Sequence, residues 1–293
     1  MKKSVPPPTL PTRTCGSHTA PAILFLHGFL GTSADWLPVA HRLRAAWRCL
    51  LVDLPGHGRA QFPEQPELYT LPGAAQAVLD GVQQPVHLVG YSMGGRLALQ
   101  LALQHPERFL SLTLISASPG LPLAAERAAR RRADDALAAE LDQHGLNAFL
   151  TAWYAQTLFG NLPRKPALWR RLLARRRRND AAGLARMLRG GSVGRQPSLW
   201  PRLQGLRLPV LLIAGQQDEK YVRVMQLVQQ QIPGAELRVV PGAAHAVVEE
   251  QPARVARTLE MFLCGNSKKL CCPSETRGAA GVTDPGHRKK KNN

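Results

Sequence analysis

The fold of this chain is decided by Gly90-Tyr91-Ser92-Met93-Gly94-Gly95. This stretch follows an apolar run, Val86 to Val89, and precedes apolar residues at helical spacing that end near Gln104. A serine between glycines, with a strand before it and a helix after it, predicts a tight turn that projects the serine hydroxyl above a sheet. Small flanking residues are needed because such a turn brings the two backbones close together. The alternative is an ordinary turn with a capping serine.

Strand-like and helix-like stretches alternate on both sides of this turn. The predicted strands are Ala22–His27, Arg48–Asp53, Val86–Gly90, Leu110–Ser116, Pro209–Ala214 and Glu236–Val240. The predicted helices are Trp36–Ala45, Leu71–Val82, Met93–Gln104, Tyr221–Gln231 and Pro252–Phe262. This is the pattern of βαβ units, so we expect an α/β fold with a mostly parallel sheet and helices on both faces.

Residues 119–205 interrupt this alternation, because they contain no strand-like run and are rich in Ala, Leu and Arg. We interpret them as a helical insertion between two parts of one core, 21–118 and 206–263. The two ends, 1–20 and 264–293, lack apolar periodicity. We therefore expect a disordered N-terminal extension and a disordered basic tail.

The composition is that of a globular protein, with 293 residues, 44% of them hydrophobic and 20% charged. A chain of this length buries a large core without disulfides or metal. We find no apolar run long enough to span a membrane and no apolar core of a signal peptide, so we expect a cytoplasmic protein. The five cysteines show no metal-ligand or disulfide-framework spacing. Oligomeric state is not indicated.

The formal net charge of +18 lies mainly in the insertion, where 16 Arg and Lys against 6 acids contribute +10. The two ends contribute +3 over residues 1–21 and +5 over residues 264–293, which leaves the rest of the chain neutral. A strongly basic chain suggests a nucleic-acid-binding protein. The neutral body and the lack of a recognised binding motif argue against that class, so we expect no nucleic-acid partner.

A serine hydroxyl needs an imidazole oriented by a carboxylate before it can act as a nucleophile or base at neutral pH. After a turn of this kind, the carboxylate and then the histidine are expected later in the chain, each following a strand. Asp218 and His245 follow the last two predicted strands in that order. We predict a triad of Ser92, Asp218 and His245, with Glu219 as the alternative carboxylate.

Two loops after predicted strands are further candidates. His27-Gly28-Phe29 ends the first predicted strand, where the backbone N–H of Phe29 could oppose that of Met93 and hold an oxyanion. The alternative is that Gly28 only permits a turn. Asp53–Gly58, after the second predicted strand, is either a pocket wall or a glycine-dependent turn.

Arginines near the serine turn indicate the kind of substrate. Arg96 lies one turn after Ser92 on the predicted helix. Arginines of the insertion could join it, namely Arg127, Arg130, Arg131, Arg132, Arg170, Arg171 and Arg175–Arg178. Guanidinium groups bind carboxylates through paired hydrogen bonds, so arginines facing the serine predict a small polyanionic substrate and not a lipid ester. The alternative for Arg96 is an exposed charge on an amphipathic helix.

Several segments together resemble one enzyme family. They are His27–Gly31, Asp53–Gly58, Gly90–Arg96, Ser116–Leu121 and Trp153-Tyr154, within a similarity that covers residues 21–263. The family is the MenH synthases of menaquinone biosynthesis, which have the α/β-hydrolase fold with a helical lid. They convert 2-succinyl-5-enolpyruvyl-6-hydroxy-3-cyclohexene-1-carboxylate to 2-succinyl-6-hydroxy-2,4-cyclohexadiene-1-carboxylate (SHCHC) and pyruvate.

The resemblance implies a role for each matching residue. Ser92, Asp218 and His245 would form the triad, and the N–H groups of Phe29 and Met93 the oxyanion hole. The residues that would bind substrate are Arg96, Arg130, Arg176, Tyr91 and Trp153.

The implied reaction is that of a carbon–oxygen lyase. Ser92, deprotonated by His245, would abstract the proton next to the succinyl ketone, and the resulting enolate would expel pyruvate. No acyl-enzyme, metal or cofactor is required, and the quinone end product could be menaquinone or phylloquinone. The alternative is a hydrolase that cleaves an ester, thioester or C–C bond of a small anionic substrate through attack by Ser92.

Overall fold

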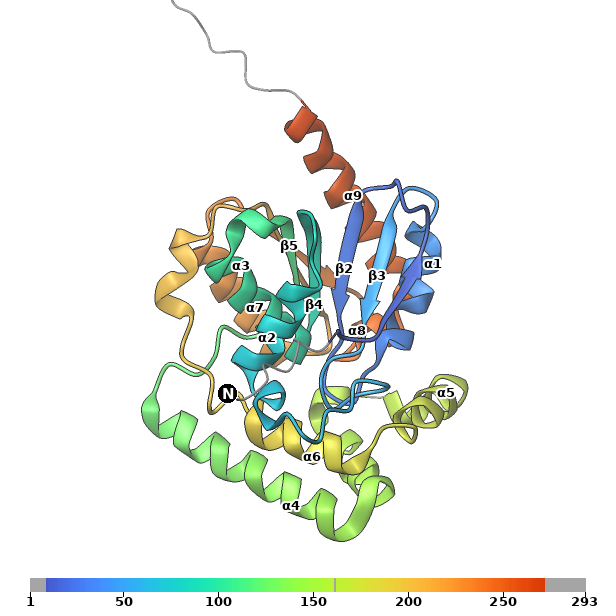
Figure 1. Ribbon diagram of the computed structural model, residues 1–293, viewed down its shortest axis with the longest axis vertical. Coiled ribbons are helices and arrows are strands. Elements are labelled where there is room, and N and C mark those ends of the chain that lie inside the picture. Colours follow the sequence, from blue (N-terminus) through green and yellow to red (C-terminus); the bar gives the residue numbers. More distant parts are fainter. Residues whose placement is uncertain (1–8, 161, 272–293) are drawn as a thin grey trace, which may run out of the picture.

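The computed structural model describes residues 9–160 and 162–271. Within these residues seven strands form one sheet in the order β1-β3-β2-β4-β5-β6-β7 (Figure 1). The strands are β1 Thr12–Cys15, β2 Ala22–Leu26, β3 Arg48–Val52, β4 Val86–Tyr91, β5 Phe109–Ile115, β6 Val210–Gly215 and β7 Glu236–Val240. Strands β2 to β7 run parallel to one another, which confirms the predicted α/β class.

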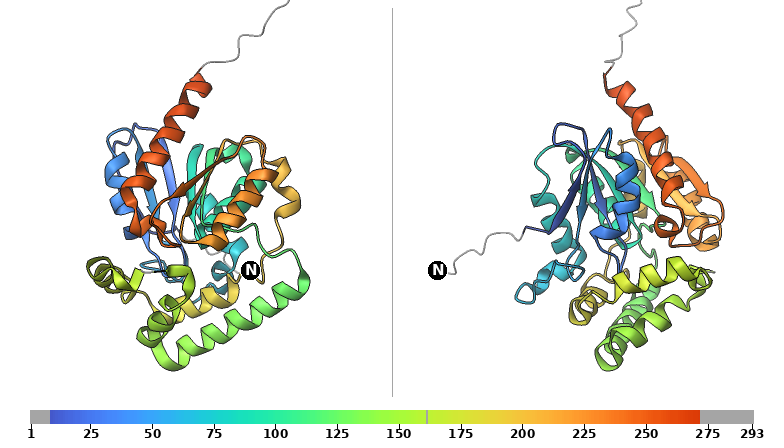
Figure 2. Two further views of the ribbon diagram at one scale, coloured as in Figure 1. Left: turned by 180° about the vertical axis from the view of Figure 1, so that it is seen from behind. Right: turned by 90° about the vertical axis from the view of Figure 1, so that its right-hand side faces the viewer.

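Helices cover both faces of the sheet (Figure 2). On one face lie α2 Leu71–Asp80, α3 Met93–Gln104 and α7 Glu219–Gln231. On the other lie α1 Leu37–Leu43 and α9 Pro252–Cys271. All residues of β4 and β6 are buried, because a parallel sheet covered on both faces leaves neither face to solvent. Burial on both faces explains why apolar residues dominate the sequences of both strands.

Two expectations about disorder were wrong in part. The segment 1–20 contains β1, which pairs antiparallel with β3. Hydrogen bonds between backbones hold this edge strand, so it needs no apolar periodicity of its own. The segment 264–293 begins inside α9, because adding residues to an established helix costs little. Residues 1–8 and 272–293 lie outside the described part of the chain.

The chain between β5 and β6 forms a group of helices at the end of the sheet where the parallel strands terminate (Figure 1). They are α4 Ala124–Tyr154, α5 Pro166–Arg176 and α6 Ala181–Gly190, with the 3-10 turns η4 Thr157–Phe159, η5 Leu162–Arg164 and η6 Trp200–Gly205. We call residues 119–205 the lid. A non-helical residue, Gly145 at φ +76°, bends α4.

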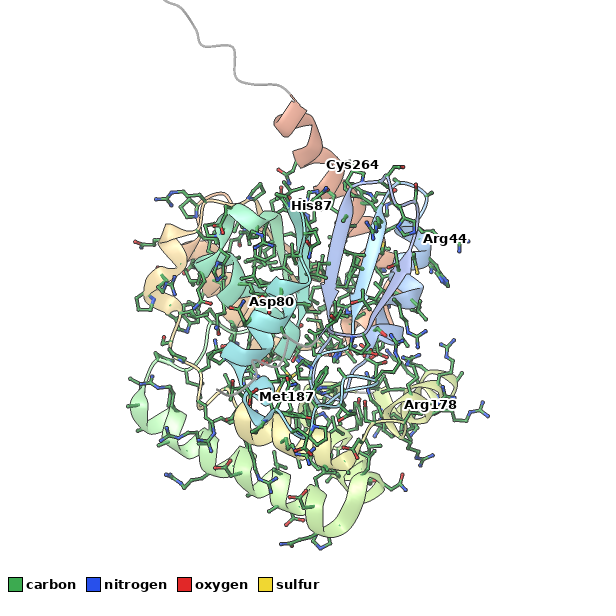
Figure 3. The ribbon with its side chains drawn as sticks, viewed as in Figure 1. Arg44, Asp80, His87, Arg178, Met187 and Cys264 are labelled. Atoms are coloured by element: carbon green, nitrogen blue, oxygen red, sulfur yellow. The ribbon has the colours of Figure 1, made fainter. Side chains whose placement is uncertain are left out.

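The lid has its own apolar cluster and also packs against helices that cover the sheet. Leu141, Phe149 and Leu184 belong to the lid cluster. Met187 of α6, at the boundary between lid and core, is buried in the cluster around α2 and α3, whereas Arg178 extends outward (Figure 3). Short elements complete the fold: η1 Ser33–Trp36, η2 Pro66–Tyr69, η3 Pro106–Arg108 and α8 Val247–Glu250. Across the described residues, each helix is too short or too polar to span a membrane.

Candidate active site

The predicted turn between β4 and α3 is present, and Ser92 is its central residue. Ser92 has φ +51°, a conformation that non-glycine residues rarely adopt. The structure around it enforces this geometry: Ser92 N–H donates to the Ile115 carbonyl at 2.8 Å. A Cβ added to Gly90 would lie 2.4 Å from the Gly94 oxygen, and one on Gly94 would lie 2.3 Å from the Leu26 oxygen. Both glycines are therefore steric requirements.

Ser92, His245 and Asp218 come together as predicted. His245 Nε2 lies 3.0 Å from Ser92 Oγ, and His245 Nδ1 lies 2.7 Å from Asp218 Oδ2. An ionised carboxylate only accepts, so Nδ1 carries the hydrogen and Nε2 is free to take the serine proton. The alternative carboxylate, Glu219, is exposed and pairs with Arg223 at 3.3 Å. The structure thus favours Asp218 over Glu219.

Three aromatic rings enclose the imidazole of His245. The ring centroids of Tyr221, Tyr91 and Phe159 lie 4.7, 5.5 and 6.0 Å from that of His245. Tyr221 was not predicted as a site residue, although it follows Asp218 closely and its N–H donates to Asp218 Oδ1 at 3.3 Å. Phe159 belongs to the lid, and no sequence signal pointed to it. The rings limit the freedom of the imidazole to turn away from Ser92.

A cavity of ≈ 590 Å³ opens from the triad towards the lid. All residues predicted to bind substrate or an oxyanion line it, namely Phe29, Tyr91, Met93, Arg96, Arg130, Trp153 and Arg176. Met93 is the first residue of α3, so its N–H has no acceptor within the helix. The oxyanion role of Phe29 and Met93 stays a prediction that this placement permits.

The loop Asp53–Gly58 does not belong to the lining of this cavity. Asp53 Oδ1 accepts a hydrogen bond from Ser33 N–H at 2.7 Å, and Gly58 N–H donates to Asn179 Oδ1 of the lid at 2.8 Å. Gly58 has φ +52°, which glycine adopts easily. Of the two interpretations of this loop, the structure favours the turn.

Arg96 faces the cavity and is not the exposed charge that we considered as an alternative. Its Nη1 donates to Gln196 Oε1 at 3.1 Å and its Nη2 to the Gly191 carbonyl at 2.8 Å. Burial lowers the pKa of its guanidinium to about 10, which leaves the group charged at neutral pH. Two lid residues thus orient a cation that α3 carries.

Arg130 is held in the cavity wall by a buried acid. Its Nε lies 2.8 Å from Asp134 Oδ1, and Ser192 Oγ donates to Asp134 Oδ2 at 2.6 Å. Asp134 and Ser192 were not predicted as site residues. The spacing of four residues between Arg130 and Asp134 on one helix was a signal for the first of them.

Arg176 lines the cavity but is not an open cation. It is 2% exposed, and its Nη1 lies 2.5 Å from Asp35 Oδ2 while its Nη2 lies 2.7 Å from Glu249 Oε1. Its Nε donates to the Tyr154 hydroxyl at 3.0 Å. A guanidinium has five N–H donors, so two remain after these three bonds. Sequence reasoning missed Asp35, Glu249 and Tyr154 because they lie on three different elements.

Comparison with known proteins shows which family the chain is similar to. A model of the alpha/beta hydrolase family matches residues 23–258. The 2-succinyl-6-hydroxy-2,4-cyclohexadiene-1-carboxylate synthase of Serratia proteamaculans is 35% identical over 252 residues, which cover 85% of this chain and 95% of that protein. A Bacillus subtilis protein that carries the same name provisionally is 36% identical over 253 residues, covering 85% and 92%. The solved structure of MenH from S. aureus is similar with a TM-score of 0.81 at 28% identity, covering 87% of this chain and 98% of that one.

Proposed function

The chain belongs to the MenH family of SHCHC synthases within the α/β hydrolases, and we propose that it eliminates pyruvate from 2-succinyl-5-enolpyruvyl-6-hydroxy-3-cyclohexene-1-carboxylate to give SHCHC. One observation carries this proposal. A hydrogen-bonded Ser92–His245–Asp218 triad opens into a cavity that Arg96 and Arg130 also line. A lipid esterase would need an apolar cavity, whereas a substrate with three carboxylates needs cations.

The reaction follows from the hydrogen bonds of the triad. His245 Nε2 takes the proton of Ser92 Oγ, and Asp218 stabilises the imidazolium that forms. The Ser92 oxygen then removes the proton α to the succinyl ketone, so that the C–H electrons form an enolate. Backbone N–H groups of Phe29 and Met93 would stabilise the enolate oxygen. Collapse of the enolate forms a C=C bond and breaks the C–O bond to the enolpyruvyl group, which leaves and is protonated to pyruvate.

The arginines bind and orient the substrate in this proposal. Arg96 and Arg130 each keep guanidinium N–H groups beyond those bonded to Gln196, Gly191 and Asp134. Charge-assisted hydrogen bonds from these groups to the substrate carboxylates would hold the acidic C–H near Ser92. A water-soluble polyanion as substrate also suits the cytoplasmic location expected from the sequence.

The direct test is to incubate the purified protein with the enolpyruvyl substrate and to follow pyruvate and SHCHC. We expect both products in equal amounts, without added metal or cofactor. If the substrate is consumed no faster than in buffer alone, the proposed function is wrong.

A hydrolase that uses Ser92 as a nucleophile is the second candidate, because the 3.0 Å contact between Ser92 Oγ and His245 Nε2 would activate either reaction. The hydrolase and the lyase differ in whether a covalent acyl-enzyme forms during the reaction. A hydrolase should react with simple activated esters and accumulate an acyl-enzyme, visible as a burst and by mass spectrometry. We expect this protein to do so poorly.

A further inference from the structure

Glu249 is a buried carboxyl in the cavity wall that the proposed reaction does not use. It lies on α8, four residues after His245, and its side chain is 3% exposed. Oε1 accepts a hydrogen bond from Arg176 Nη2 at 2.7 Å, whereas Oε2 is buried and has no hydrogen-bond partner among the described residues. A buried ionised carboxylate with one oxygen unpaired is unfavourable. The position therefore suits a neutral carboxyl or a ligand that supplies a partner.

The two nearby arginines lie closer to Asp35 than to Glu249, so the two acids do not share the positive charge equally. Arg176 lies between Asp35 and Glu249, and its neighbour Arg175 places Nε 2.8 Å from Asp35 Oδ1. Asp35 Oδ2 also accepts a hydrogen bond from Thr32 N–H at 3.0 Å. Asp35 therefore has two cations and a backbone donor, while Glu249 shares one cation. Of the two acids, Glu249 is the one that this arrangement leaves protonated.

The pKa shifts agree with this assignment. Burial raises the pKa of Glu249 to about 7, and Asp35 adds to the rise while Arg176 opposes it. Burial also acts to raise the pKa of Asp35, but Arg176 and Arg175 bring that pKa below its usual value. The other titratable groups that act on this cluster are the phenols of Tyr91 and Tyr154, whose pKa burial raises, and the imidazoles of His27 and His57, whose pKa burial lowers, so all four stay neutral.

We propose that Glu249 is a positioning residue, which holds a proton so that the positive charge of Arg176 stays available to a ligand carboxylate in the cavity. This inference rests on the proposed function, because it takes the ligand to be a polyanion. An ionised Glu249 would repel such a ligand and neutralise Arg176, whereas the neutral carboxyl still accepts the hydrogen bond from Arg176 without adding a negative charge. The proton comes from solvent before binding and stays on Glu249 throughout, so no covalent bond changes.

The substitution Glu249→Gln tests the protonation state directly. The amide keeps an oxygen for Arg176 and puts a permanent NH₂ donor where the carboxyl hydroxyl would be. Because a carboxyl with a pKa near 7 is about 10% protonated at pH 8, we expect the ratio of kcat/KM of Glu249→Gln to that of wild type to rise about tenfold between pH 6 and pH 8, through KM. Taking the ratio removes any pH dependence that the two proteins have in common.

Two further variants serve as comparisons for this result. Glu249→Ala, which removes the acceptor of Arg176 Nη2, should have a lower kcat/KM than Glu249→Gln at every pH. Glu236→Gln is the matched control, since Glu236 is exposed on β7 and pairs with Arg238 at the surface, so its ratio to wild type should not change with pH. A Glu249→Gln ratio that is flat or falls with pH would mean that Glu249 acts as an ionised acceptor, and would overturn the proposal.

A titration without ligand separates this proposal from the proposed function. In protein with ¹³C-labelled glutamate carboxyls, one resonance should titrate near neutral pH and be missing from Glu249→Gln. If Glu249 titrates in the ordinary acidic range instead, the inference is wrong even though pyruvate is released. If the resonance behaves as expected but no pyruvate forms, the error lies in the proposed function and not in the proton on Glu249.

Discussion

The sheet and the lid differ in what determines the environment of a charged residue. In the sheet, the triad residues lie just beyond the ends of apolar strands, so their positions follow from the strand pattern. In the lid, neighbouring arginines of one run have different environments: Arg176 is buried between two acids, while Arg177 and Arg178 are exposed. A residue's place in the core follows from its own stretch of chain, but a lid arginine's role depends on distant partners.

The largest expected effect comes from Ser92→Ala, a change in the core that removes a reacting group. We expect pyruvate release to fall about 10⁴-fold, because the general base is lost while binding groups remain. The circular dichroism spectrum and thermal unfolding should match wild type, since a methyl group fits where the hydroxyl was. Turnover close to wild type would show that the base has been assigned wrongly.

We expect Arg176→Met to lower the free energy of unfolding as much as a substitution in the core does. The change leaves Asp35 and Glu249 buried without their shared cation, which typically costs about 3–5 kcal/mol. Urea unfolding monitored by tryptophan fluorescence measures the loss. A loss below about 1 kcal/mol would mean that water reaches the two acids and that the buried pairs are not maintained in solution.

Arg96→Met should weaken binding more than it weakens folding. Loss of one charge-assisted hydrogen bond to a ligand carboxylate is worth about 1.5–3 kcal/mol, so we expect kcat/KM to fall roughly 10- to 100-fold, mainly through KM. Steady-state kinetics at saturating and low substrate separate the two constants. An unchanged KM with a lower kcat would place Arg96 in the chemical step and not in binding.

The smallest effect is expected from Arg189→Met, the matched control for Arg176→Met within the lid. Arg189 pairs with Asp142 at 2.6 Å, but both side chains are exposed to solvent by more than 40%. Solvent screens such pairs, so the unfolding free energy should change by about 0.5 kcal/mol or less in the same urea experiment. An effect as large as that of Arg176→Met would show that burial does not distinguish the two arginines.

Much of the core could be predicted because its signals are local. All six predicted strands are present, with ends within one residue of those expected, and α3 spans the predicted residues. The two errors concern segments with little apolar pattern of their own, namely β1, whose backbone pairs with β3, and the end of α9, which extends an established helix. Periodicity detects a buried face, but it does not detect a backbone that pairs at the edge of a sheet.

The catalytic residues could be predicted from the sequence, but most of the residues that hold the site in place could not. Strand-end positions and chain order indicated the triad, because the sheet brings such ends together. Asp134 and Tyr221 act on residues four and three positions away in the chain, which is a local signal. Glu249 was missed because it acts on Arg176, which is 73 residues away and which the fold places beside it. An acid of this kind looks like any surface acid until its burial is known.

The amino-acid order alone determined the parallel sheet, the tight turn at Ser92 and the succession of serine, aspartate and histidine, because backbone sterics and apolar spacing act between near neighbours in the chain. Only the tertiary structure decided which arginines face the cavity and which acids hold them. Arg176 and Asp35 are separated by 141 residues yet share a hydrogen bond. Such a pair owes its strength to the exclusion of water, which arises when the lid and the sheet pack together.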